Sequence, residues 1–199
     1  LISSLSGCTT NPATGESVFT GMSSDEQELR VGREQHPQII KAFGGEFGSP
    51  ELRRYVDSIG QLLARTVERK KFKYTFTLLN SGIVNAFALP GGYIYISRGL
   101  MALAENEAEV AGVLAHELGH INALHHGRRE GQGLLANILL TGVGIAGGRA
   151  AADLGSLVVG GALRSYSREH ELESDSLALR YMSRAGYDPQ AMVNFLRKM

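Results

Sequence analysis

The sequence predicts an α+β fold that is mostly α-helical and contains a small β-sheet. Three short runs between residues 72 and 97 alternate or concentrate β-forming side chains and are separated by Gly and Pro. Segments with helical apolar spacing and clear start signals lie on both sides of these runs. At 199 residues the chain suits one domain, which we expect to span 23–199 after an amino-terminal segment, 1–22.

The balance of charges excludes a strong electrostatic partner. Lys+Arg number 20 and Asp+Glu number 20, so the formal net charge is +0. We therefore expect neither nucleic acid nor an anionic membrane surface to bind this chain through charge.

The amino-terminal segment carries a targeting pattern. Leu5-Ser6-Gly7-Cys8 resembles a bacterial lipobox, so Leu1 to Gly7 would be the remnant of a signal peptide. Cys8, the sole cysteine, would then be lipid-modified and anchor the protein to a membrane. The other interpretation is a free thiol in a flexible tail. Thr9 to Gly21 is expected to be a tether. The pattern predicts a periplasmic lipoprotein of the bacterial cell envelope, on the outer membrane.

Two helices are expected next. The first begins at Ser23-Ser24 and runs toward Ala42, with Pro37 expected to bend or split it. The second begins at Ser49-Pro50, with proline at the first helical position. Its predicted apolar stripe consists of Leu52, Val56, Ile59, Leu62 and Leu63.

Three strands are expected at 72–79, 84–89 and 93–97, followed by a short helix over 98–104. Proline cannot donate to a sheet ladder, and Pro90 follows the second strand, so we place that strand at the sheet's edge. An exposed edge can accept a peptide as an added strand. The predicted substrate-binding residues are Asn85, Ala86, Phe87 and Ala88. The alternative is an interior strand whose small residues serve packing.

The next helix contains His116-Glu117-Leu118-Gly119-His120, a His-Glu-x-x-His motif, and is expected to continue to about His126. Histidines four apart share one helix face, so two imidazoles can bind one tetrahedral Zn²⁺. Glu117 is not a ligand in this pattern and could take a proton from a metal-bound water. Asn106 is the expected N-cap.

A third protein ligand can come from two places. His126 lies six residues after His120, but the turn that would bring it back needs glycine where Ala123 stands. Alternatively, Glu171 binds the metal while Asp175, four residues on, orients a ligand histidine. Glu169 and Glu173 lie close by, so the acidic residues could also form a solvated face.

The carboxy-terminal third contains two further features. The segment 134–161 is apolar and rich in glycine. It could form two buried helices joined by a turn, a mobile cover over the site, or a patch that dips into a membrane. Beyond it, Ser167 is expected to cap a helix that ends at Gly186, and Asp188-Pro189 opens another helix.

The sequence resembles the gluzincin zinc peptidases that include the CAAX prenyl proteases, HtpX and the BepA-type periplasmic proteases. The resemblance rests on His-Glu-x-x-His followed by Glu-x-x-x-Asp, and on the stretches 85–95, 165–171 and 184–189. It covers roughly Ser23 to the end. Some members carry membrane helices, which this sequence lacks, and periplasmic members often continue into a helical repeat domain that would be missing after Met199.

The resemblance implies a zincin-like metallopeptidase domain with a small sheet packed over the metal-binding helix. It also implies one zinc per chain, with His116, His120 and Glu171 as ligands, Glu117 as general base and Asp175 behind a ligand. Candidates for stabilising the oxyanion are Arg164, Tyr166, Arg168 and His170.

The expected function is zinc-dependent endopeptidase activity on unfolded or misassembled envelope proteins. The alternative is an envelope assembly factor, or chaperone, that binds outer-membrane polypeptides and cleaves them secondarily. A third interpretation is a structural zinc protein, which Glu117 disfavours because a structural site needs no base.

Overall fold

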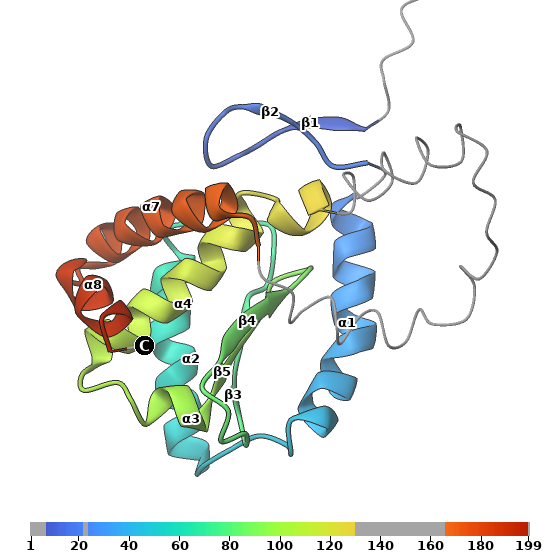
Figure 1. Ribbon diagram of the computed structural model, residues 1–199. Coiled ribbons are helices and arrows are strands. Elements are labelled where there is room, and N and C mark those ends of the chain that lie inside the picture. Colours follow the sequence, from blue (N-terminus) through green and yellow to red (C-terminus); the bar gives the residue numbers. More distant parts are fainter. Residues whose placement is uncertain (1–6, 22–23, 130–165, 199) are drawn as a thin grey trace, which may run out of the picture.

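The computed structural model describes residues 7–21, 24–129 and 166–198, and it confirms an α+β fold that is mostly helical (Figure 1). The strands are β1 (Cys8–Thr10), β2 (Ser17–Phe19), β3 (Thr75–Leu79), β4 (Ala86–Leu89) and β5 (Tyr93–Ser97). The helices are α1 (Asp25–Ala42), α2 (Pro50–Ala64), α3 (Arg98–Met101), α4 (Glu107–Asn122), α7 (Arg168–Ala185) and α8 (Gln190–Leu196).

The central sheet has the strand order β3-β5-β4, with β3 parallel and β4 antiparallel to β5. The prediction that the second strand lies at an edge is therefore confirmed. Side chains alternate between two cores, as the period of a strand requires. Ile94 and Ile96 face the core shared with α2 and α4, whereas Tyr95 faces α1. The sheet thus lies between α1 on one side and α2 and α4 on the other (Figure 1).

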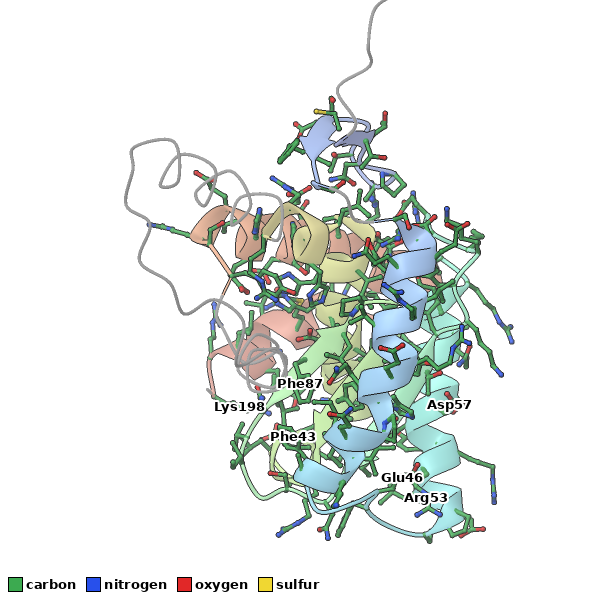
Figure 2. The ribbon with its side chains drawn as sticks, turned by 90° about the vertical axis from the view of Figure 1, so that its right-hand side faces the viewer. Phe43, Glu46, Arg53, Asp57, Phe87 and Lys198 are labelled. Atoms are coloured by element: carbon green, nitrogen blue, oxygen red, sulfur yellow. The ribbon has the colours of Figure 1, made fainter. Side chains whose placement is uncertain are left out.

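Helix α1 begins at the predicted cap, where Ser24 accepts a hydrogen bond from the backbone N–H of Gln27. Pro37 was expected to bend or split this helix; it does not split it, and α1 runs as one helix from Asp25 to Ala42 with Pro37 inside it. Its contact with the sheet includes Phe43 and Phe87, whose ring centroids are 5.2 Å apart (Figure 2). Gly32 allows this approach, since a Cβ there would lie 2.2 Å from the carbonyl oxygen of Pro90.

Helix α4 lies between the sheet and the α7–α8 pair (Figure 1). Its side chains Leu114, Ala115 and Leu118 are completely buried. Gly119 brings α7 close, because a Cβ at that position would lie 2.9 Å from the carbonyl oxygen of Ser174. This close approach places Glu171, the candidate third ligand on α7, beside the His-Glu-x-x-His motif of α4.

The prediction that this helix continues to about His126 is wrong. Helix α4 ends at Asn122, and Leu124 takes a left-handed backbone conformation with φ of 60°. The side-chain carbonyl of Asn122 accepts from the backbone N–H of Arg69, which ties the helix end to the loop before the sheet. A new helical turn then begins at His125.

The expected tether is also folded over its described part. Strands β1 and β2 form an antiparallel hairpin that lies next to α7 (Figure 1). Asn11 is fully buried and donates to Glu173 at 2.9 Å, and Arg180 donates to the carbonyl of Ala13. Turn-forming polar residues suggested a tether, but two hydrogen bonds, from Asn11 to Glu173 and from Arg180 to Ala13, attach the hairpin to α7.

Three predictions lie outside the described residues: the signal-peptide remnant up to Ser6, the glycine-rich segment 134–161, and Arg164. Of the helices within 7–21, 24–129 and 166–198, none has both the length and the apolar character needed to span a membrane.

Candidate metal centre and active site

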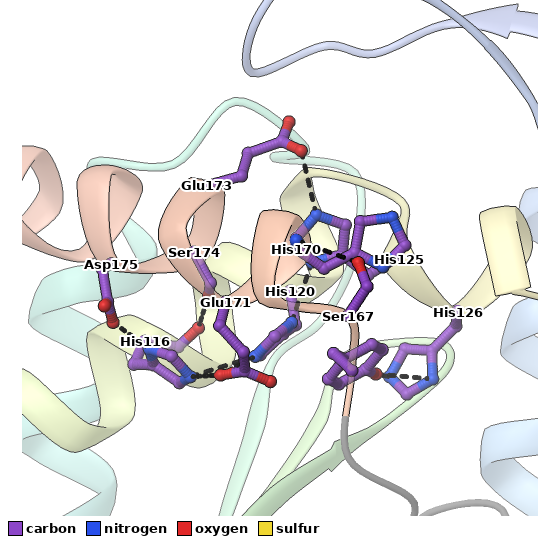
Figure 3. A network of polar contacts seen from close by, with 11 residues as sticks. His116, His120, His125, His126, Ser167, His170, Glu171, Glu173, Ser174 and Asp175 are labelled. Atoms are coloured by element: carbon purple, nitrogen blue, oxygen red, sulfur yellow. Dashed lines mark hydrogen bonds and ion pairs between the residues drawn. The ribbon is translucent and has the colours of Figure 1, made fainter.

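Three side chains from two helices converge on one point (Figure 3). His116 and His120 lie one turn apart on α4, and Glu171 lies in the first turn of α7. The Nε2 atoms of the two histidines are 3.0 Å apart, and Oε2 of Glu171 lies 3.3 Å from that of His116 and 3.8 Å from that of His120. These ligand atoms all lie within 4.8 Å of one another. The arrangement matches the ligand set expected from the sequence.

The partners of the opposite ring nitrogens fix which atom of each histidine faces the centre. Asp175 accepts from Nδ1–H of His116 at 2.9 Å, and Nδ1 of His120 lies 2.8 Å from Nδ1 of His125. With protons on both Nδ1 atoms, two bare Nε2 atoms would face each other at 3.0 Å. A cation between them removes this repulsion. Two imidazoles and one carboxylate are ligands that Zn²⁺ accepts with a fourth position left open, so the residues fit zinc.

The pKa values of the two histidines agree with a shared cation site. Burial acts to lower the pKa of His116, but hydrogen bonds to Asp175 and Glu171 outweigh it and raise that pKa to about 10. Burial and the neighbouring His116 lower the pKa of His120 far below its usual range. Without metal, His116 therefore carries a proton on each ring nitrogen while His120 is neutral, and a metal ion has to displace the additional proton of His116.

Glu117 lies beside this centre and is buried. Burial is the largest influence on its carboxyl group and raises its pKa to about 7. A general base works best when its pKa is close to the working pH, so this carboxylate suits proton transfer at neutral pH. It shares a cavity of about 300 Å³ with His116, Glu171 and Asp175.

The same cavity extends to the edge strand. Asn85 and Ala86 line it, together with apolar side chains of the helices: Leu100, Val113, Met192, Phe195 and Leu196. Phe87 points to the opposite face of the sheet, where it stacks on Tyr95, and Ala88 is buried. Of the four residues predicted to hold substrate, two therefore line the cavity, namely Asn85 and Ala86.

The alternative ligand, His126, is not one of the three converging residues. Its ring lies 3.0 Å from the hydroxyl of Tyr166 and is buried. Of the described oxyanion candidates, Tyr166 lies nearest the centre, because its ring stacks on His120 at 4.0 Å. His170 instead stacks on His125, and Arg168 is exposed at the start of α7.

Sequence reasoning missed two residues beside the centre. His125 is fully buried against His120, and its Nε2 lies 3.1 Å from Oε2 of Glu173. Burial lowers the pKa of His125 to about 4, so the ring is neutral at pH 7. Glu173 was assigned to a possible solvated face, and no local pattern links it to His125, which lies 48 positions away.

The sequence is similar to those of known peptidases. The model of "Peptidase family M48" matches residues 50–199. The "Beta-barrel assembly-enhancing protease" of Yersinia pestis is 32% identical over 205 residues, which cover 94% of this chain and 40% of that protein. The protein of the same name from Escherichia coli K12 is 30% identical, with 96% and 41% covered.

A relative that matches a shorter stretch extends the similarity to eukaryotes. The "Mitochondrial metalloendopeptidase OMA1" of Saccharomyces cerevisiae is 33% identical over 120 residues, which cover 58% of this chain and 33% of that protein. The chain spans about two fifths of the length of the two bacterial relatives. The family model covers most of the chain, including both halves of the metal centre. The chain therefore belongs to peptidase family M48.

Proposed function

We propose that this chain is a zinc-dependent endopeptidase. The observation that carries the proposal is the convergence of His116, His120 and Glu171 next to the buried carboxylate of Glu117, in one open-sided cavity. A structural zinc site would have no use for that carboxylate. Membership of a peptidase family and the word metalloendopeptidase in a relative's name support the same activity.

Each residue of the site has a separate role in the proposed reaction. A zinc ion, when bound, supplies a Lewis acid that polarises the scissile carbonyl and makes water more acidic. His116, His120 and Glu171 hold this ion. Glu117 accepts a proton from the attacking water and delivers it to the leaving amine. Tyr166 is the candidate donor to the oxyanion, because its ring stacks on His120 at 4.0 Å. Its hydroxyl lies 3.0 Å from His126 in this structure and would have to turn toward the cavity.

The edge strand β4 is proposed to hold the substrate in extended form. Ser97 donates its backbone N–H to the carbonyl of Asn85, so this pair is hydrogen-bonded across β5 and β4. In an antiparallel ladder bonding alternates, which directs the N–H groups of Ala86 and Ala88 away from β5 and toward the free edge. A peptide bound there would need an extended, unfolded segment and few particular side chains.

The relatives and the amino terminus support a proposal for the substrates and the location of this chain. Two relatives are named for enhancing β-barrel assembly, and we propose that unfolded or misassembled envelope proteins are the substrates of this chain. We also propose a lipid anchor at Cys8, which is exposed at the start of β1. The protein would then be a periplasmic lipoprotein of the outer membrane. A Cys8 peptide with unmodified mass in the native protein would exclude that anchor.

Cleavage of an unfolded protein tests the proposed activity. The purified chain is expected to degrade casein, to lose this activity after removal of metal by a chelator, and to regain it with about one equivalent of zinc. A folded, disulfide-free globular protein is the control and should remain intact. Casein cleavage that is insensitive to chelation would contradict the proposal.

Substitution of the edge strand tests substrate binding. Ala88→Pro removes one outward N–H while leaving the ladder to β5 intact, so KM for peptides should rise by about tenfold, corresponding to one lost hydrogen bond. Bound zinc should change little. Thermal stability should fall because the larger ring overpacks a buried position, so KM is measured at a temperature where the variant is fully folded. Ala88→Ser, which keeps the N–H, is the matched control. Unchanged KM in Ala88→Pro would exclude docking on this edge.

The names of the bacterial relatives also favour a second function, assistance of β-barrel assembly by binding. This activity would not need proton transfer by Glu117. Promotion of β-barrel assembly by Glu117→Gln, which cannot cleave, would support it, and loss of both assembly promotion and cleavage would argue for the protease alone.

A further inference from the structure

We propose that His125 and Glu173 are positioning residues that fix the orientation and tautomer of His120 and thereby strengthen metal binding. This inference rests on the proposed metal site. It assigns a role to a second series of hydrogen bonds, which leads from His120 on α4 through His125 in the following turn to Glu173 on α7 (Figure 3).

The direction of the hydrogen bonds follows from the carboxylate at the far end. Glu173 can only accept, so Nε2 of His125, 3.1 Å away, has to carry a proton. A metal bound at Nε2 of His120 leaves the proton of that ring on Nδ1, so Nδ1 of His125, 2.8 Å away, is bare and accepts it. His120 in turn presents a bare Nε2 to the centre. This is the tautomer that a metal ligand needs.

The carboxylate of Glu173 is itself held in place from three sides. Arg128 donates to Oε2 at 2.7 Å, alongside His125. Asn11 of the amino-terminal hairpin donates to Oε1 at 2.9 Å. The side chain of Glu173 is mostly buried, so these donors are not exchanged freely with water. The hairpin therefore completes the support of a metal ligand.

The backbone is shaped to bring His125 into this position. In a continuous helix, His125 would lie about 140° around the axis from His120 and could not reach its Nδ1. Helix α4 instead ends at Asn122, and Leu124 adopts φ of 60°. A left-handed non-glycine residue is strained and persists where the surroundings require it. Here that conformation turns the fully buried His125 back against His120.

The two ligand histidines are thus supported in parallel ways. His116 donates directly to Asp175, which the sequence predicts. His120 reaches Glu173 through one intervening imidazole. Both carboxylates come from α7, the helix that also supplies Glu171. One helix therefore provides a ligand and the supports of the other two ligands.

Zinc affinity, measured by competition with a chelator at fixed pH, tests the inference. His125→Leu should weaken zinc binding by about 10–100-fold. His125→Asn can place its side-chain oxygen near the former Nδ1 and still accept from His120. This variant should therefore bind zinc at least about fivefold more tightly than His125→Leu. Equal loss in both variants would attribute the effect to packing and overturn the proposal.

The second arm asks whether Glu173 acts through His125. Glu173→Ala should weaken zinc binding by about tenfold in the wild-type background and by less than about twofold in the His125→Leu background. Additive losses would overturn the assigned chain of hydrogen bonds. Ile121→Ala, a buried position next to His120, should lower thermal stability without changing zinc affinity.

These measurements distinguish failure of the positioning role from failure of the proposed metal site. If the wild-type chain binds no zinc, the metal site itself is wrong. If the wild type binds zinc and His125→Leu binds it within about twofold of the wild type, only the positioning role is wrong.

Discussion

Glu117→Gln is expected to bind about one zinc per chain and to cleave casein at least about 1,000-fold more slowly than the wild type. The amide has nearly the same shape as the carboxylate but cannot accept the proton of the attacking water. Glu117 is not one of the three converging ligand atoms, so metal binding should survive. The measurements are zinc content by mass spectrometry and the rate of casein cleavage.

A matched substitution separates this effect from a general loss of charge. Glu169→Gln makes the same chemical change at an exposed position in the first turn of α7 and should leave both quantities unchanged. Activity of Glu117→Gln above about a tenth of the wild-type rate would be incompatible with a role as general base.

Glu171→Ala is expected to abolish stoichiometric zinc binding, and with it casein cleavage. The carboxylate supplies the only oxygen among the three converging atoms, and it lies within 3.8 Å of both imidazole nitrogens. His126→Leu should keep its zinc, because that ring contacts Tyr166 instead of the centre. Zinc content and equilibrium affinity of the two variants give the comparison.

The reverse outcome, zinc lost in His126→Leu and retained in Glu171→Ala, would show that the other ligand route is correct. The sequence alone suggests Glu173→Ala as a neutral control for Glu171→Ala, since the two positions lie about 160° apart on the helix. The structure changes that expectation. Glu173 faces away from the centre but supports His120 through His125, so its removal should weaken binding without abolishing it.

Local signals predicted much of the fold. Ser24, Ser49, Asn106 and Ser167 each accept the capping hydrogen bond that a helix start requires, and Gly186 ends α7 in the left-handed conformation. Alternation along 72–79 predicted a strand there, and Tyr74, Phe76 and Leu78 do lie together in the core shared with α2 and α4. These features depend on neighbours within a few residues, which is why the sequence reveals them.

The features that were missed depend on distant neighbours. Leu124 adopts the left-handed conformation that usually requires glycine, so no residue type in the sequence indicates the end of α4. Asn11 and Glu173 are 162 positions apart, and their hydrogen bond holds the amino-terminal hairpin against α7 where the sequence predicted a tether. Helical spacing alone did not distinguish Glu171 from its acidic neighbours, and the resemblance to the gluzincin peptidases implied it as the ligand. The close packing of α7 on Gly119 places Glu171 beside the motif.

The most direct test of the metal centre is crystallographic. Anomalous diffraction from crystals of the purified protein, collected on both sides of the zinc absorption edge, locates zinc without reference to activity. We expect one peak per chain, within about 2.0–2.2 Å of Nε2 of His116, Nε2 of His120 and a carboxylate oxygen of Glu171. A peak on His126 in place of Glu171, or no zinc at the convergence of α4 and α7, would contradict the assignment.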